Sequence, residues 1–157
     1  MTEKRQRMIS AMKYILLVII VGYLVILMLY ASGSKRTFSE VSKAVSSVLD
    51  SKELVQMDDQ MLKRNYGLNS ADYKGVLYYS SPSSISAAEV LVIQVKNDAQ
   101  IENVTNAIAQ RIEDFDSYLP EQVKLLEDSQ ESIRGRYIFF AVSSKASEYR
   151  SAFDKSL

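Results

Sequence analysis

The sequence predicts an α+β fold, with one N-terminal transmembrane helix and a two-layer domain of about four β-strands with helices packed on one face. Three observations predict it. Residues 14–31 form an uncharged apolar run, later segments alternate between helical and strand-like periods, and two strand-like segments flank Gly135. The predicted organisation is a basic N-terminus (1–13), a transmembrane helix (14–31), a linker (32–36) and an extracytoplasmic α+β domain (37–157).

The apolar run, YILLVIIVGYLVILMLYA, is the predicted contact with a lipid bilayer. At about 1.5 Å per residue its helix spans about 27 Å, close to the roughly 30 Å apolar core of a membrane. Four basic residues precede the run, and Lys35 and Arg36 follow it, so we expect residues 1–13 to stay in the cytoplasm. The expected location is the cell membrane, crossed once. The alternative is a signal peptide cleaved near Gly33, although its apolar core would be unusually long.

Composition and charge narrow the possible functions. Residues 1–31 carry four basic and one acidic side chain, which gives +3, and the remainder carries 15 basic and 18 acidic side chains, which gives −3. The domain therefore lacks the basic field of a nucleic-acid binder. Cysteine and histidine are absent, which excludes disulfides and thiolate chemistry and removes the usual proton shuttle. We expect no nucleic-acid partner, no metal, no cofactor and no enzymatic activity.

The domain is predicted to begin with two helices. Thr37 with Glu40 three residues later is typical of a capping box, and an apolar period of three and four continues to about Leu49. A second helix is expected at 58–66. Gly67 follows it and suits the left-handed position after a helix.

Strand and helix patterns alternate through the rest of the domain. Residues 73–79 are aromatic and β-branched, residues 90–96 form a second apolar strand, and Asp98 is expected to cap the longest helix, which ends before Pro120. The remaining predicted elements are a helical turn at 121–128, a hairpin of 129–134 and 137–142, and a helix at 144–153.

Two groups of residues are candidates for binding a ligand. Lys63, Arg64 and Tyr66 end the second helix and could together hold an anionic ligand or an envelope polymer. Arg134 and Arg136 flank the hairpin turn and could contact lipid phosphates or an acidic patch of a partner. The alternative for each group is purely structural. Lys63 and Arg64 would be solvated basic residues that interact favourably with the dipole at the end of the helix, and Arg134 and Arg136 would belong to a solvated hairpin.

Five short blocks follow one another along the domain: LKRNYGLN (62–69), DYKGVLYY (72–79), EVLVIQVK (89–96), YLPEQ (118–122) and GRYIFFAV (135–142). In this order they resemble the domain-of-unknown-function family 4358, and the resemblance covers roughly residues 38–153. It implies a Gram-positive bacterial cell-envelope protein without an established activity. Many relatives look like lipoproteins attached through a cysteine. This chain has none, so its own apolar run is expected to be the anchor.

The expected function is that of a non-enzymatic interaction or accessory module of the bacterial cell envelope, with a protein partner. The alternative is a ligand-binding or catalytic domain that acts on cell-wall glycan or teichoic polymer. That alternative would use Lys63, Arg64 and Tyr66, and it requires these side chains to line a cleft.

Overall fold

The computed structural model of the chain describes residues 2–31 and 35–157, with the side chains of 6–28, 35–115 and 117–157. The chain divides into two compact units, and the boundary between them along the sequence falls between Gly33 and Ser34. Most of the predicted linker, 32–36, therefore lies outside the described residues.

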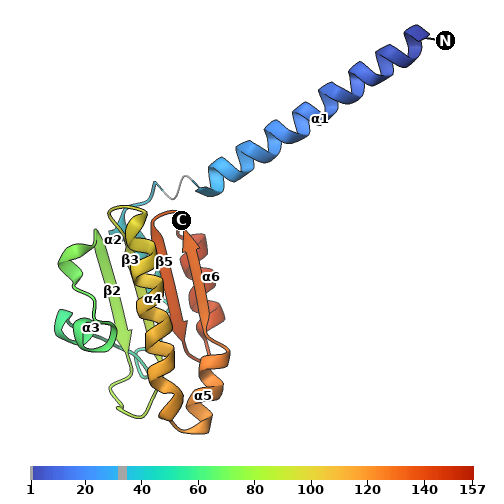
Figure 1. Cartoon of the computed structure of the whole chain (residues 1–157). Coiled ribbons are helices and arrows are strands. Elements are labelled where there is room, and N and C mark those ends of the chain that lie inside the picture. Colours follow the sequence, from blue (N-terminus) through green and yellow to red (C-terminus); the bar gives the residue numbers. More distant parts are fainter. Residues whose placement is uncertain (1, 32–34) are drawn as a thin grey trace. The chain divides into compact units, whose positions relative to one another are not determined.

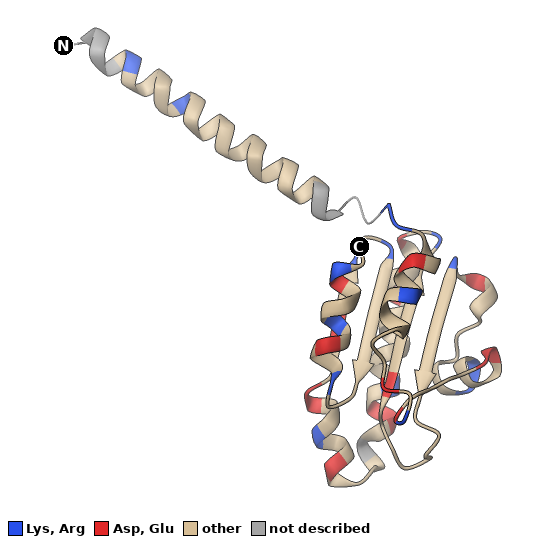
Figure 2. Ribbon diagram, turned by 180° about the vertical axis from the view of Figure 1, so that it is seen from behind, with Lys and Arg blue, Asp and Glu red and all other residues tan. Residues whose placement is uncertain are grey.

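The first unit is a single helix, α1 (Thr2–Ala31), drawn in blue in Figure 1. Its segment Gln6–Met28 is long and apolar enough to cross a membrane, a property that a signal sequence shares. Figure 2 shows blue basic positions only toward its N-terminal end, at Arg7 and Lys13 of the described side chains, and tan along the rest of the described helix. Insertion, orientation and retention of this helix stay predictions.

The second unit is built on a five-stranded antiparallel sheet with the order β1-β2-β3-β5-β4. The α+β class is confirmed, with one strand more than predicted. The additional strand pairs only two residues, Val55 and Gln56, with the end of its neighbour, and two residues are too few to show a period. The strands are β1 (Val55–Gln56), β2 (Gly75–Ser80), β3 (Glu89–Gln94), β4 (Gln130–Arg134) and β5 (Tyr137–Val142).

The two central strands, β3 and β5, are buried on both faces. Along β3, Val90 and Val92 face one apolar core, whereas Leu91 and Ile93 face a second core on the opposite side. Phe139 and Phe140 divide between the two cores in the same way. Because both faces carry large apolar side chains, both need a covering layer.

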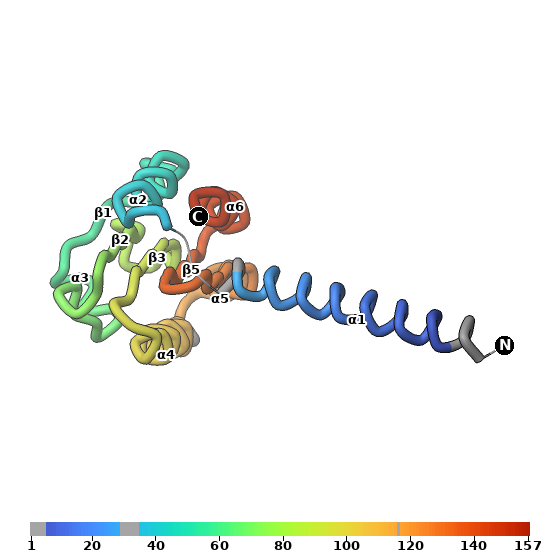
Figure 3. The backbone as a smooth tube through the Cα atoms, turned by 90° about the horizontal axis from the view of Figure 1, so that it is seen from above, coloured from blue at the N-terminus to red at the C-terminus, as the bar shows by residue number. Residues whose placement is uncertain are grey.

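Helices accordingly cover both faces, and the prediction that they pack on one face only was wrong. The helices α2 (Phe38–Ser46) and α6 (Ala146–Lys155) cover one face. The other is covered by α3 (Asp59–Tyr66), α4 (Ala99–Asp114) and α5 (Pro120–Glu127). Figure 3 shows α2 and α6 on one side of the strands and α4 on the other.

Two of the three predictions made for the helix ends are confirmed. The Thr37 hydroxyl accepts from the Glu40 amide, and the Glu40 carboxylate accepts from the Thr37 amide at 2.8 Å, which completes the capping box. Gly67 is left-handed, with φ of 68°. Asp98 does not cap α4. Its carboxylate instead lies 3.4 Å from the Nε atom of Arg136.

The start of α2 is fixed against the end of the sheet at which β3 finishes. The Phe38 ring stacks on Tyr137 with their centroids 6.5 Å apart, and it also covers Gly75, where a Cβ atom would overlap the ring. The Tyr137 hydroxyl donates to the carbonyl of Arg36 at 2.9 Å. These contacts determine where the chain enters the second unit.

Candidate functional site

The predicted ligand residues at the end of α3 point in different directions. Lys63 and Arg64 are exposed, whereas Tyr66 is buried against the sheet. The helix ends here because Gly67 takes the left-handed conformation, and the apolar face of α3 places Leu62 and Tyr66 in the core. The three predicted residues therefore do not line a common cleft in the structure.

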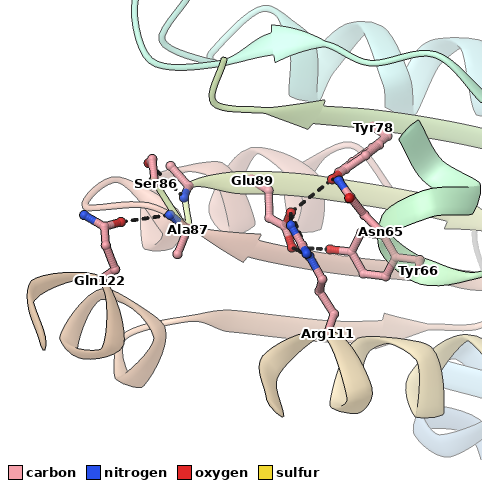
Figure 4. A network of polar contacts seen from close by, with 9 residues as sticks. Asn65, Tyr66, Tyr78, Ser86, Ala87, Glu89, Arg111 and Gln122 are labelled. Carbon is pink, nitrogen blue, oxygen red and sulfur yellow. Dashed lines mark hydrogen bonds and ion pairs between the residues drawn. The ribbon is translucent and has the colours of Figure 1, made fainter. Parts of the chain in front are cut away.

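The Tyr66 hydroxyl belongs to a buried polar network centred on Glu89, the first residue of β3 (Figure 4). Tyr66 donates to Oε1 of Glu89 at 2.6 Å, and Tyr78 of β2 donates to Oε2 at 3.1 Å. Arg111 of α4 donates from Nε to Oε1 at 3.2 Å and from Nη2 to Oε2 at 3.1 Å. Each carboxylate oxygen thus accepts at least two bonds, which fills its lone-pair positions.

Further contacts extend this network to the surrounding elements. The Asn65 side-chain amide donates to the Tyr78 hydroxyl at 2.7 Å. The Arg111 guanidinium lies 4.3 Å above the Phe115 ring and 5.8 Å from the centre of the Tyr66 ring. Such cation–π contacts gain strength when the cation is desolvated. The network therefore joins α3, β2, β3 and α4 through side chains that satisfy one another.

The environment of the network fixes its protonation at neutral pH. Burial raises the pKa of the Tyr66 hydroxyl well above its usual value near 10, and the charge of Glu89 raises it further. The same two causes raise the pKa of Tyr78. Burial alone lowers the pKa of Arg111, but its hydrogen bonds with Glu89 raise it overall. Both tyrosines are neutral donors, and Arg111 remains a cation.

The second predicted pair lies at the opposite end of the sheet. Tyr66 reaches the Glu89 end of β3, whereas Arg134 and Arg136 flank the turn beside Gln94, at the other end of that strand. Arg134 lies 3.5 Å from a carboxylate oxygen of Asp154. Arg136 contacts Asp98 and donates to the carbonyl of Lys96 at 3.0 Å. The structure does not bring the two predicted groups together.

Sequence reasoning missed Glu89 and Arg111, the two charged members of the network. Each nevertheless leaves a signal. Glu89 opens a strand whose six residues are all buried, and a carboxylate in such a strand requires a partner. Arg111 lies between Ile108 and Phe115 on the apolar stripe of α4, where a cation also needs a partner. A separation of 22 residues hid their pairing.

Next to the network lies an apolar groove of about 310 Å³, formed by the β2–β3 loop and the α4–α5 connection. Ile85 and Leu119 stand on its walls with 62% and 55% of their surfaces exposed, although large aliphatic side chains usually seek burial. We call it the distal groove. It is lined by Ser84, Ile85, Ser117, Tyr118 and Leu119.

Specific contacts fix both walls of the distal groove. On one wall, the Phe115 ring lies between Arg111 and Tyr118, with the two rings edge to face and their centroids 4.7 Å apart. On the other, the loop runs directly into Glu89, and the Ala87 amide donates to the Gln122 side chain at 2.8 Å (Figure 4). The groove is therefore positioned by packed and hydrogen-bonded residues on both sides.

The family model described as a domain of unknown function (DUF4358) matches residues 47–143. This match covers more than half of the chain, so the chain belongs to that family. It includes the whole network and the whole distal groove. No curated protein and no solved structure matches the chain.

Proposed function

We propose that the chain is a membrane-anchored, non-enzymatic interaction domain of the bacterial cell envelope, and that it binds a protein partner through the distal groove. Its first unit supplies a helix long and apolar enough to serve as the anchor. Its second unit presents the groove. The main observation in support of a binding function is that Ile85 and Leu119 are exposed on opposite walls of a groove that buried residues hold in place.

The location of the groove supports this function. The chain enters the second unit near Arg36, whose carbonyl accepts from Tyr137 beside the Gln94 end of β3. The groove lies next to Glu89, at the other end of the same strand, roughly 17 Å away at the usual strand rise. A partner can therefore bind the groove without contacting the residues through which the chain enters the domain.

The chemistry of the network supports binding rather than catalysis. The Glu89 carboxylate is buried and already accepts from Tyr66, Tyr78 and Arg111, so it is not free to act as a general base on a substrate. Action on cell-wall glycan or teichoic polymer through Lys63, Arg64 and Tyr66 receives no support from this geometry, because the Tyr66 ring is packed in the core. A polymer that raises the thermal midpoint of the full chain would revive that alternative.

Site-specific photo-crosslinking in intact cells tests the proposal. A photoreactive residue at position 85 or 119 should join the full chain to one discrete protein. Position 133 on β4 is the matched control, because Ile133 is 45% exposed but lies at the far end of the sheet. The double variant Ile85→Ser/Leu119→Ser should weaken binding of the identified, purified partner at least tenfold. Equal adducts from all three positions, or unchanged affinity of the double variant, would overturn the proposal.

A further inference from the structure

The sequence around the distal groove is mainly acidic, and its first basic residue on the α5 side is Lys124. Residues 112–123 include four carboxylates and neither Lys nor Arg, and the loop 81–88 is uncharged. At neutral pH this local charge is −4. The nearest cations in sequence are Arg111, which is bound to Glu89, and Lys124 on α5.

The described carboxylates of this segment have no cationic partner. Glu113, Asp114 and Glu121 are exposed, and among the described side chains no Lys or Arg lies within ion-pair distance of them. The Gln110 amide lies 3.3 Å from Asp114 and 3.5 Å from Glu113, and it is uncharged. Among the described side chains, no ion pair therefore neutralises these acidic groups, which adjoin the groove residues in the sequence.

We infer that the distal groove binds a polypeptide segment in which one or two large apolar side chains are flanked by Lys or Arg. This inference rests on the proposed function and specifies its partner. Ile85, Tyr118 and Leu119 provide the apolar contact, and burying their exposed surface supplies the affinity. The flanking carboxylates attract the basic residues within a Debye length of about 8 Å and raise the association rate.

The size of the groove also fits such a segment. A volume of about 310 Å³ lies at the lower end of the range for ligand pockets, roughly 300–1,000 Å³. It accommodates side chains of a short segment, while the basic flanks remain outside against the acidic rim. An acidic polymer of the teichoic type is disfavoured here, because its phosphates would meet the exposed carboxylates of Glu113, Asp114 and Glu121, none of which forms an ion pair with a described Lys or Arg.

Labelled peptides and the full chain in phosphatidylcholine nanodiscs test the inference. We expect a peptide with Leu and Phe between lysines to bind. Replacing its lysines by glutamates, or its Leu and Phe by serines, should weaken binding at least tenfold. Fluorescence anisotropy at 50 and 300 mM salt should show weaker binding at the higher concentration, since the rim charges are screened. Ile85→Ser should weaken binding tenfold.

Charge reversal supplies the matched control. The triple variant Glu113→Lys/Asp114→Lys/Glu121→Lys should lose the basic peptide and gain the glutamate peptide. The triple variant Asp72→Lys/Glu102→Lys/Glu148→Lys makes the same change in net charge at exposed positions outside residues 81–88 and 112–123, and it should bind like the wild type.

The outcomes separate this inference from the proposed function. Equal loss in both triple variants, no effect of Ile85→Ser, or preference for the acidic peptide overturns the basic-segment inference. If the photo-crosslinks at positions 85 and 119 persist in that case, the proposed function stands. If those crosslinks join two copies of this chain, the occupant is a second copy and the inference is overturned. If the crosslinks are missing, the proposed function itself fails.

Discussion

Arg111 of α4 and Glu89 of β3 form an ion pair of 3.1 Å, although 22 residues separate them and their side chains are only 13% and 1% exposed. Removing two charges from water is costly, and the bonds from Tyr66 and Tyr78 offset part of that cost. The pair therefore depends on the whole network. Loss of one charge should be far more damaging than loss of an exposed pair.

Arg111→Met is expected to lower the free energy of unfolding by about 3–5 kcal/mol, because it leaves the Glu89 carboxylate buried without a cation. Adding Glu89→Gln should cost much less than the sum of the two single changes. Denaturant titration of the full chain in detergent, followed by circular dichroism, measures this coupling. Arg136→Ala is the control, because the Arg136–Asp98 pair is largely exposed, and it should change stability by at most about 1 kcal/mol. Additive, small effects at Arg111 and Glu89 would contradict a coupled network.

Stability should decrease as the pH rises above about 10. Tyrosines of the unfolded chain ionise near pH 10, whereas burial raises the pKa of Tyr66 and Tyr78 in the folded chain. Above pH 10 the unfolded state therefore binds fewer protons, and the free energy of unfolding falls by up to about 1.4 kcal/mol per pH unit for each residue. Below that pH both states are protonated, and this contribution is constant.

The double variant Tyr66→Phe/Tyr78→Phe is the test of this alkaline effect. Its stability should fall less steeply between pH 10 and 12 than that of the wild type, as measured by denaturant titration at each pH. Some slope should remain, because burial also raises the pKa of Tyr73 and Tyr137. Identical slopes for the two proteins would show that the buried pair does not cause the decline.

Gly75→Ala is expected to destabilise the second unit by about 1–3 kcal/mol, because the new methyl group overlaps the Phe38 ring. The additional change Phe38→Ala should relieve this overlap, so that Gly75→Ala costs less in its presence. Gly22→Ala is the control, since nothing described lies within 4 Å of its added carbon. Thermal unfolding in detergent measures the stability of Gly75→Ala, of its combination with Phe38→Ala, and of the Gly22→Ala control. Equal costs of Gly75→Ala with and without Phe38 would refute close contact.

The predicted orientation is tested by labelling introduced cysteines, for which the native chain provides no background. Lys124→Cys, at an exposed position of α5, should react with a membrane-impermeant maleimide in intact cells. Thr2→Cys should react only after the cells are opened. Labelling of Thr2→Cys alone in intact cells would reverse the orientation. A mature protein that begins near Ser34 would instead support a cleaved signal sequence.

Local signals in the sequence predicted most of the elements. The capping box at Thr37 and the left-handed Gly67 depend on neighbouring residues only, and both are present. The cap expected at Asp98 is missing because Asp98 itself has helical backbone angles, with φ of −68° and ψ of −24°, whereas a capping residue is extended. Its carboxylate lies instead near Arg136, 38 positions away. Contacts between distant residues are not encoded in a local pattern.

The arrangement of the layers was partly readable in the sequence. The segment 137–142 is apolar at every position, and a strand that is apolar on both faces implies covering helices on both. The candidate site was harder to predict from the sequence. Tyr66 was predicted as a candidate ligand contact, and only the fold shows that its hydroxyl reaches Glu89. The distal groove joins two connections more than 30 residues apart, so no single motif marks it.

The packing of Phe38 and Arg36 against Tyr137 has a mechanical consequence. Tension on the chain that precedes residue 35 would enter the domain at this point and pass directly to β5. That strand is hydrogen-bonded to β3 on one side and to β4 on the other, so the load would be shared by two ladders. An entry point on the two-residue edge strand β1 would instead peel the sheet open from its side. Tension applied at this point would therefore have to break two strand ladders rather than one.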